Sequence, residues 1–162
     1  MKLYQAQLAD IHKLAPLYVM YRQERHIHSE IETIEDFLHE RLARNDIVIF
    51  YTETGQGEVT GFVQLNPMFS AVELKRIWLL YDLYAKEEVR SQVTEHLLAR
   101  ARQLSEETHS GLIMLHSHSA EGAHNPALTD QLRYIRNTVM YAHGAKADDA
   151  QDTTSGNDKP AE

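Results

Sequence analysis

Cysteine is absent from this chain of 162 residues. Its absence excludes a disulfide framework, a thiolate metal site and a cysteine nucleophile. Long apolar runs are missing as well: no segment approaches membrane-spanning length, and the first residues, MKLYQAQLAD, lack the apolar core of a signal peptide. These absences predict a cytoplasmic protein that does not enter a membrane.

Basic residues are scarce. Lysine and arginine number 16 against 24 acidic residues, which gives a formal net charge of −8. Because nucleic acids are bound by basic surfaces, this balance argues against nucleic acid as a partner and mildly favours cationic partners such as amines. Hydrophobic residues make up 43% of the chain, as expected for a globular domain that buries a core.

No large apolar residue follows position 143. Residues 144–162, which include the stretch AKADDAQDTTSGNDKPAE, contain none. A segment of this composition cannot offset the entropy lost on ordering, so we expect a disordered acidic tail. The predicted organisation is one domain over residues 1–143, followed by that tail.

Hydrophobic periodicity predicts alternating strands and helices. The expected strands cover 2–5, 47–52, 58–65, 73–84, 112–116 and 134–143, with turns at 53–57 and 66–70. Helices are expected from Leu8, from a cap at Thr33 to about Arg44, and over 87–108 and 125–132. Pro16 predicts a kink or a late start in the first helix. The predicted inward face of the second helix is formed by Phe37, Leu38, Leu42 and Ala43.

This order of elements predicts an α/β fold with a mixed sheet. Residues 73–116 should form a parallel, right-handed strand–helix–strand unit. Ligands of such sheets bind beyond the carboxyl ends of strands, which places the expected site near residues 81–88.

Two stretches carry a resemblance to a known family. Residues 57–90 read GEVTGFVQLNPMFSAVELKRIWLLYDLYAKEEVR and residues 37–50 read FLHERLARNDIVIF. They resemble the central meander, and the second helix and strand, of bacterial members of the GNAT superfamily of acetyl-CoA-dependent N-acetyltransferases. The resemblance covers residues 1–143 and implies a mostly antiparallel sheet with helices on both faces. It also implies acetyl transfer to a small-molecule or protein amine, and it is compatible with a homodimer formed through sheet edges.

The resemblance implies where acetyl-CoA binds. In the family, the strand end that corresponds to Leu83 and Tyr84 offers backbone groups to the pantetheine arm. A glycine-bearing turn then closes around the pyrophosphate at the start of the next helix. Aligning the family's paired leucines with Leu97 and Leu98 places the coenzyme contacts of that turn at Arg90, Ser91, Gln92, Val93 and Thr94. A later motif adds Asn125.

That turn departs from the family pattern. Gln92 and Thr94 occupy the two glycine positions, and Arg90 is the substitute for the usual cation, one place along. A threonine forced into the left-handed region would cost ~1–2 kcal/mol. The helix dipole contributes only ~0.3–1 kcal/mol toward an anion. The turn also carries three carboxylates that repel phosphate: Glu87, Glu88 and Glu95. The sequence therefore predicts that acetyl-CoA binding is weakened or lost.

The candidate catalytic residues lie beside this turn. In the family, the strand of Asp82 faces the reaction centre, so this carboxylate could take a proton from an ammonium acceptor. A surface ion pair or a cap is the alternative role. Thr129 occupies the position of the family's general-acid tyrosine. Tyr84, Tyr134 and Tyr141 could stand in for it, and Tyr84 and Tyr134 are the preferred candidate acids. For these tyrosines, packing with a satisfied hydroxyl is the alternative.

Other side chains favour structural roles. His116 and His118 share one face of a strand, but a third ligand at a recognisable spacing is missing, so no metal site is expected. Tyr18 and Tyr21 could line an acceptor pocket, although core positions are favoured for both.

Three interpretations remain open: an acetyltransferase with a weak coenzyme site, an inactive GNAT fold that binds a ligand or partner, and an enzyme of altered chemistry with a less anionic ligand.

Overall fold

The structure is a computed structural model, and it describes residues 1–114. The strands are β1 (Lys2–Gln5), β2 (Val48–Glu53), β3 (Val59–Ser70), β4 (Lys75–Ala85) and β5 (Gly111–Met114). The helices are η1 (Leu8–Asp10), α1 (Ile11–Gln23), α2 (Ile31–Ala43), η2 (Glu87–Val89) and α3 (Arg90–Glu107). The helix expected at 125–132, the strand expected at 134–143 and the tail lie outside the described residues.

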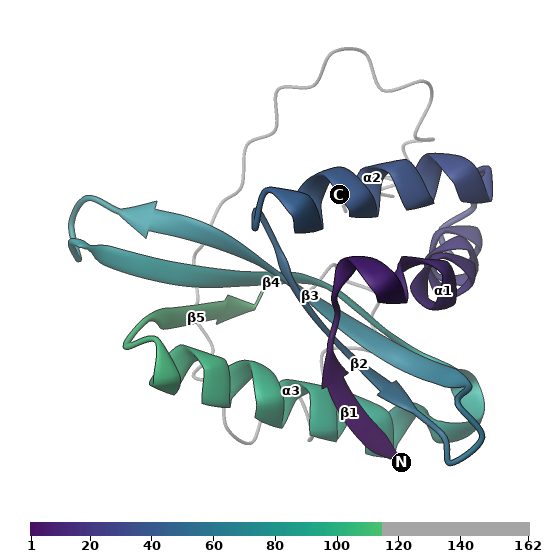
Figure 1. Cartoon of the computed structure of the whole chain (residues 1–162). Coiled ribbons are helices and arrows are strands. Elements are labelled where there is room, and N and C mark those ends of the chain that lie inside the picture. Colours follow the sequence, from purple (N-terminus) through teal and green to yellow (C-terminus); the bar gives the residue numbers. More distant parts are fainter. Residues whose placement is uncertain (115–162) are drawn as a thin grey trace, which may run out of the picture. The chain divides into compact units, whose positions relative to one another are not determined.

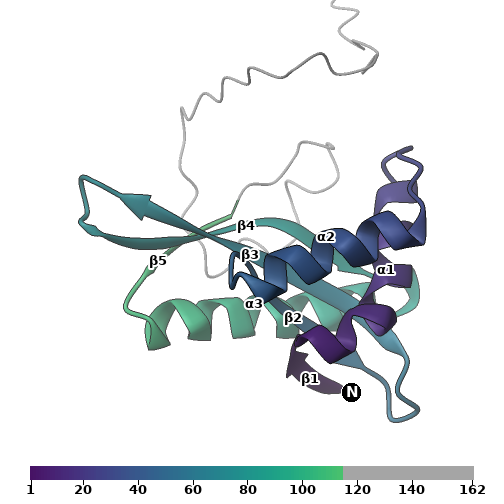
Figure 2. The same cartoon turned by 45° about the horizontal axis from the view of Figure 1, so that its top comes forward.

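The described strands form one sheet in the order β1-β2-β3-β4-β5 (Figure 1). Strands β1 to β4 pair antiparallel, and β5 joins β4 in parallel, as predicted for the strand–helix–strand unit. Helices α1 and α2 lie on one face of the sheet and α3 on the other, which is clear after rotation (Figure 2). The predicted mixed, mostly antiparallel fold is confirmed. No helix among these residues is long and apolar enough to span a bilayer.

Two helix predictions need correction. Pro16 lies inside α1, which starts at Ile11, so the late start was wrong. Helix α2 begins at Ile31, after an extended N-cap residue Glu30, rather than at a Thr33 cap, and it buries Ile34 and Leu38. The predicted inward residue Phe37 is instead 47% exposed.

The β3–β4 hairpin is longer than predicted. Residues 66–70 were expected to form a turn, but they continue β3, with Asn66 opposite Leu79 and Ser70 opposite Lys75. Strand β2 pairs with β3 only as far as Leu65, so β4 is the single described neighbour of β3 beyond that point. Pro67 is tolerated there because an edge strand does not need every N–H for pairing.

Each face of the sheet has its own core. On the α3 face the core is aliphatic with one phenylalanine and one tryptophan, and its centre is Phe50, Val63, Leu65, Trp78, Leu80, Val93, Leu97 and Leu98. On the α1–α2 face it is richer in tyrosine, and its centre is Leu14, Leu17, Tyr18, Tyr21, Leu38, Ile49, Tyr51, Phe62 and Tyr84. Among the residues of these two sets, the tyrosines all belong to the α1–α2 face.

A β-bulge changes which side chains of β4 point to each face of the sheet. Gln64 of β3 pairs with Asp82 and Leu65 pairs with Leu80, so Tyr81 is an extra residue on β4. Trp78 and Leu80 belong to the α3-side core, and without the bulge Asp82 and Tyr84 would follow them. The extra residue reverses the alternation and moves both side chains to the α1 face.

Candidate functional site

A hydrogen-bonded polar network crosses from α1 to the bulge of β4. The Tyr21 hydroxyl donates to Asp82 Oδ1 at 2.7 Å. The Gln64 side-chain amide donates to Asp82 Oδ2 over a longer 3.5 Å, and the Tyr18 hydroxyl donates to Gln64 Oε1 at 3.0 Å. Asp82 is half-buried, so this carboxylate is held by neutral donors while part of it still contacts solvent.

Aromatic packing fixes the two tyrosines that build this network. Tyr18 stacks on Phe62, with ring centroids 4.0 Å apart, and Tyr21 meets the same ring edge-on at 5.4 Å. Because the tyrosines are three residues apart on α1, they lie on the same side of the helix. The preference for core packing of Tyr18 and Tyr21 is confirmed, since each is 6% exposed.

Burial sets the protonation of these hydroxyls. Burial raises the pKa of Tyr18, and the charge of Asp82 raises it further. Burial also raises the pKa of Tyr21, together with the hydrogen bond to Asp82 and the charge of that carboxylate. Both hydroxyls therefore keep their protons well above neutral pH and remain donors to the network.

Tyr84 is buried beside the network. It is 6% exposed, and its ring lies 5.8 Å from Tyr21 and 6.2 Å from Phe62, centroid to centroid. Burial raises the pKa of Tyr84, and the neighbouring Glu24 carboxylate adds to the rise. The hydroxyl is thus protonated at neutral pH, the state that a general acid requires, but the ring is a packing element of the core.

The turn before α3 forms a helical segment. The N–H of Val89 donates to the Lys86 carbonyl at 3.1 Å, and Arg90 N–H donates to the Glu87 carbonyl, closing η2 directly onto α3. None of residues 86–94 has a positive φ, so Thr94 avoids the left-handed strain considered from the sequence. Val93 is fully buried and Thr94 is 6% exposed, which leaves Arg90, Ser91 and Gln92 as the exposed members of the predicted phosphate set.

The turn before α3 carries charges of both signs. Glu87 and Glu88 are exposed in its first residues. The Arg90 guanidinium is engaged by the Glu24 carboxylate at 3.3 Å and by the Ala85 carbonyl at 3.3 Å. Two of the first N–H groups are already bonded within the turn, so the helix start offers an anion less than a glycine loop would. This turn therefore presents two exposed carboxylates and an arginine that already contacts a carboxylate and a carbonyl.

One glycine permits the close approach of α3 to the sheet. A Cβ on Gly61 of β3 would lie 2.4 Å from Val93 Cγ1 and 2.8 Å from the Tyr84 carbonyl oxygen. The close contact lies next to the start of α3, so Gly61 sets the distance between that helix and the end of β4.

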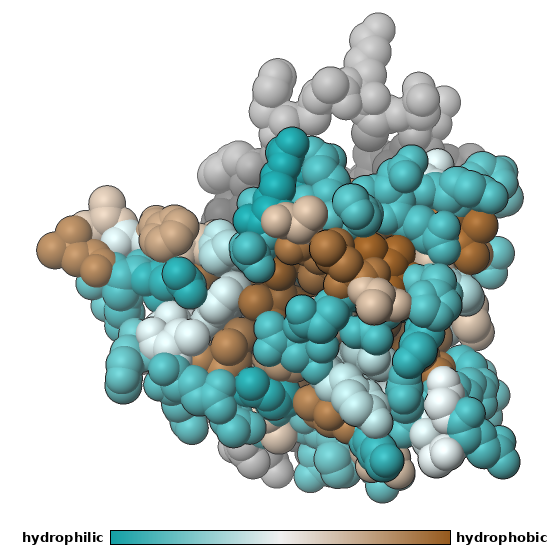
Figure 3. Space-filling model, viewed as in Figure 1, coloured by the Kyte–Doolittle hydropathy of each residue, from teal (hydrophilic) through white to brown (hydrophobic). Residues whose placement is uncertain are grey.

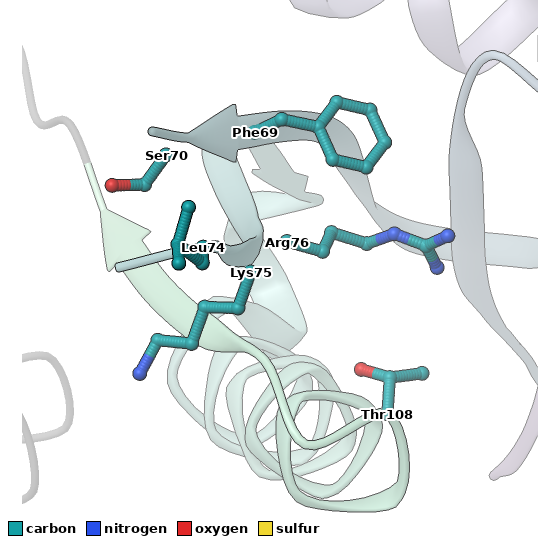
Figure 4. Close-up of a pocket in the computed structure, with 6 residues that line it drawn as sticks. All are labelled: Phe69, Ser70, Leu74, Lys75, Arg76 and Thr108. Carbon is teal, nitrogen blue, oxygen red and sulfur yellow. The ribbon is translucent and has the colours of Figure 1, made fainter. Parts of the chain in front are cut away.

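A hollow of about 600 Å³ lies elsewhere, at the tip of the β3–β4 hairpin. Its lining is shown in Figure 4 and consists of Phe69, Ser70, Leu74, Lys75, Arg76 and Thr108. Apolar side chains gather at this tip in the surface view (Figure 3), where Phe69 is 77% and Leu74 87% exposed. Asp82 pairs with Gln64 on the other half of the hairpin, so the hollow does not contain the polar network.

The structure brings part of the predicted site together. Asp82, Leu83 and Tyr84 end the same strand, and the turn of Arg90 follows it directly. Asn125 and Tyr134 lie outside the described residues. Sequence reasoning missed Gln64 as a partner of Asp82. The sequence does contain a signal for this pair, since Gln64 and Asp82 are polar residues within apolar strands. A signal for the bulge exists as well, because the alternation of apolar positions is interrupted between Leu80 and Leu83.

Comparison with known proteins identifies the family. No family model matches the chain. The crystal structure of a probable acetyltransferase superposes with a TM-score of 0.82 and 34% sequence identity, covering 91% of this chain and 99% of that one. The chain belongs to the GNAT superfamily of N-acetyltransferases.

Two curated relatives agree with this family. The uncharacterized N-acetyltransferase YhfO of Bacillus subtilis is 38% identical over 92 residues, a match that covers 57% of this chain and 61% of that protein. A probable acetyltransferase of Haemophilus influenzae is 29% identical over 115 residues, covering 70% of this chain and 79% of that protein. The match to the first relative thus spans less than two thirds of its length.

Proposed function

We propose that this protein is an acetyl-CoA-dependent N-acetyltransferase that transfers the acetyl group to an amine and holds its coenzyme weakly. The single observation that carries the proposal is the half-buried Asp82 carboxylate at the β4 bulge, fixed by Tyr21 at 2.7 Å. Membership of the GNAT superfamily supports acyl transfer as the reaction class. Without cysteine, transfer is direct or passes through another residue type.

Asp82 is the proposed base. An amine acceptor arrives as an ammonium ion and must lose a proton before its nitrogen can attack a thioester carbonyl. The carboxylate of Asp82 takes that proton, directly or through one water, while a C–N bond forms and the C–S bond to coenzyme A breaks. The thiolate that leaves is protonated by a tyrosine, for which Tyr84 and Tyr134 remain the two candidates.

On the coenzyme side, the backbone of Leu83 and Tyr84 would hold the pantetheine arm, with Asn125 beyond the described residues. Arg90, Ser91 and Gln92 would be the exposed contacts for the phosphates. The proposed setting is the cytoplasm, and assembly as a homodimer stays a prediction.

Thermal unfolding of the full chain with and without acetyl-CoA tests coenzyme binding. At about a hundred times the dissociation constant, the ligand stabilises the fold by ~2.7 kcal/mol, which raises the midpoint by several degrees. Release of free coenzyme A is then followed with a panel of amines. A midpoint shift with amine-dependent release supports the proposal. No shift at millimolar acetyl-CoA contradicts it.

A second candidate function is an inactive GNAT fold that binds a ligand or partner. The observation that favours it is the turn before α3, where Glu87 and Glu88 are exposed and the glycines are missing. This candidate predicts no coenzyme A release with any amine, whether or not acetyl-CoA binds.

A further inference from the structure

Two side chains of opposite charge lie on different sides of Tyr21. The hydroxyl end of the ring contacts Asp82 at 2.7 Å. The guanidinium carbon of Arg25 lies 3.7 Å from the ring centroid, over its face. Tyr21 lies in the last turn of α1, and Arg25 lies in the turn that follows the end of this helix at Gln23. A single tyrosine side chain thus contacts both a cation and an anion.

Neither charge is neutralised by an ion pair within residues 1–114. The neighbouring acid, Glu24, is engaged by Arg90 at 3.3 Å. The hydrogen-bond donors to Asp82 are the neutral side chains of Tyr21 and Gln64. The polar contact of Arg25 is the Tyr21 carbonyl at 3.3 Å, and Arg25 is exposed. The described part of the chain therefore leaves both charges available to a ligand.

We propose that the acceptor is an amino acid, whose ammonium group binds Asp82 and whose carboxylate binds Arg25. This inference rests on the proposed function, because it names the class of amine that the same site would acetylate. A guanidinium is planar and presents paired N–H donors that match the two oxygens of a carboxylate. The cation held over the Tyr21 ring retains free N–H edges for such a contact.

The competing role for Arg25 is a contact with coenzyme phosphate. Arg25 follows Glu24, which reaches Arg90 at the start of α3. The two roles differ in what changes when the arginine is removed: acceptor discrimination in the first case, and coenzyme affinity in the second.

The experiment measures binding to the full-length protein by titration calorimetry. The probes are the common L-amino acids, their carboxamides and the corresponding amines without a carboxyl group. We expect at least one amino acid to bind about ten-fold or more tightly than its carboxamide. In Arg25→Gln, that difference should fall to about two-fold or less, and Arg25→Lys should retain part of it. The matched control is Arg44→Gln, an exposed arginine at the end of α2, which should keep the full difference.

Three results would overturn the inference. The first is equal or tighter binding of the carboxamides, and the second is the absence of binding by any amine at millimolar concentration. The third is an Arg25→Gln variant that loses acetyl-CoA affinity but discriminates between acceptors as before. Coenzyme A release is measured in parallel, so that the two proposals fail separately. Amine-dependent release without carboxylate discrimination supports acetyl transfer alone, whereas discrimination without any release supports the amino-acid site alone.

Discussion

Different side chains surround the carboxyl end of β4 on its α1 side and on its α3 side. On the acceptor side, α1 presents Tyr18 and Tyr21, and their hydroxyls join Gln64 and Asp82 in one network. On the other side, the η2 turn before α3 contains no glycine and exposes two glutamates, and Arg90 at the start of α3 forms an ion pair with Glu24. A GNAT fold needs the second side to hold acetyl-CoA and the first to activate an amine. This contrast is the basis of the proposal that acetyl-CoA is held weakly while Asp82 activates the amine.

The largest expected effect comes from removing the base. Asp82→Asn keeps the shape of the side chain and its contact with Tyr21, but it cannot accept a proton from the acceptor. A positioned general base contributes about 10²-fold to 10⁴-fold, so kcat/KM should fall by that factor with little change in Tm. Steady-state kinetics and thermal unfolding measure both. If Asp82→Asn kept the activity of the original protein, Asp82 would have a structural role and would not be the base.

Gly61→Ala tests the packing that positions the coenzyme side. The new methyl group would meet Val93 Cγ1 at 2.4 Å and the Tyr84 carbonyl at 2.8 Å, so the helix or the strand must shift. Overpacking of this kind costs about 1–3 kcal/mol. The matched control is Gly55→Ala, since a Cβ there meets nothing within 4 Å. Chemical denaturation gives both free energies of unfolding, and equal values would contradict the close approach.

The pH dependence of stability in alkaline solution tests the raised pKa of Tyr21. The pKa of Tyr21 is raised in the folded state, so above about pH 10 the unfolded chain loses this proton first. The folded state then binds more protons than the unfolded state, and stability falls as pH rises. In Tyr21→Phe, the free energy of unfolding should decrease less steeply with pH, by up to about 1.4 kcal/mol per pH unit, which is the value for one proton. Denaturation between neutral and alkaline pH measures the slope, and identical slopes would contradict the raised pKa.

The smallest expected effect is a gain in affinity for acetyl-CoA. Removing the charges in Glu87→Gln with Glu88→Gln takes two carboxylates away from the start of the helical turn. Each charge near a helix start changes anion binding modestly, so the Kd for acetyl-CoA should fall by about 3-fold to 30-fold. Glu106→Gln, exposed at the other end of α3, should have little effect. Calorimetric titration with acetyl-CoA compares the variants, and an unchanged Kd would assign the weakness to the missing glycines instead.

Much of the fold could be predicted from local pattern. The spacing of Val93, Leu97 and Leu98 predicts the inward face of α3, and all three are buried. Asp82 is likewise a candidate base from the sequence, because the strand to which it corresponds in the resembled family faces the reaction centre. The boundaries were harder to predict. Thr33 has the chemistry of a helix cap, but α2 begins two residues earlier, at Ile31, after the extended Glu30.

The sequence by itself determined which segments become strands and helices, and which side chains must leave water. These properties depend on neighbours along the chain, and hydrophobic periodicity records them directly. Only the tertiary structure decided that Asp82 faces Tyr21. That outcome depends on the extra residue Tyr81, which is accommodated between two pairings with β3. A bulge arises where two strands must keep register together, so its position is a property of the pair rather than of either strand alone.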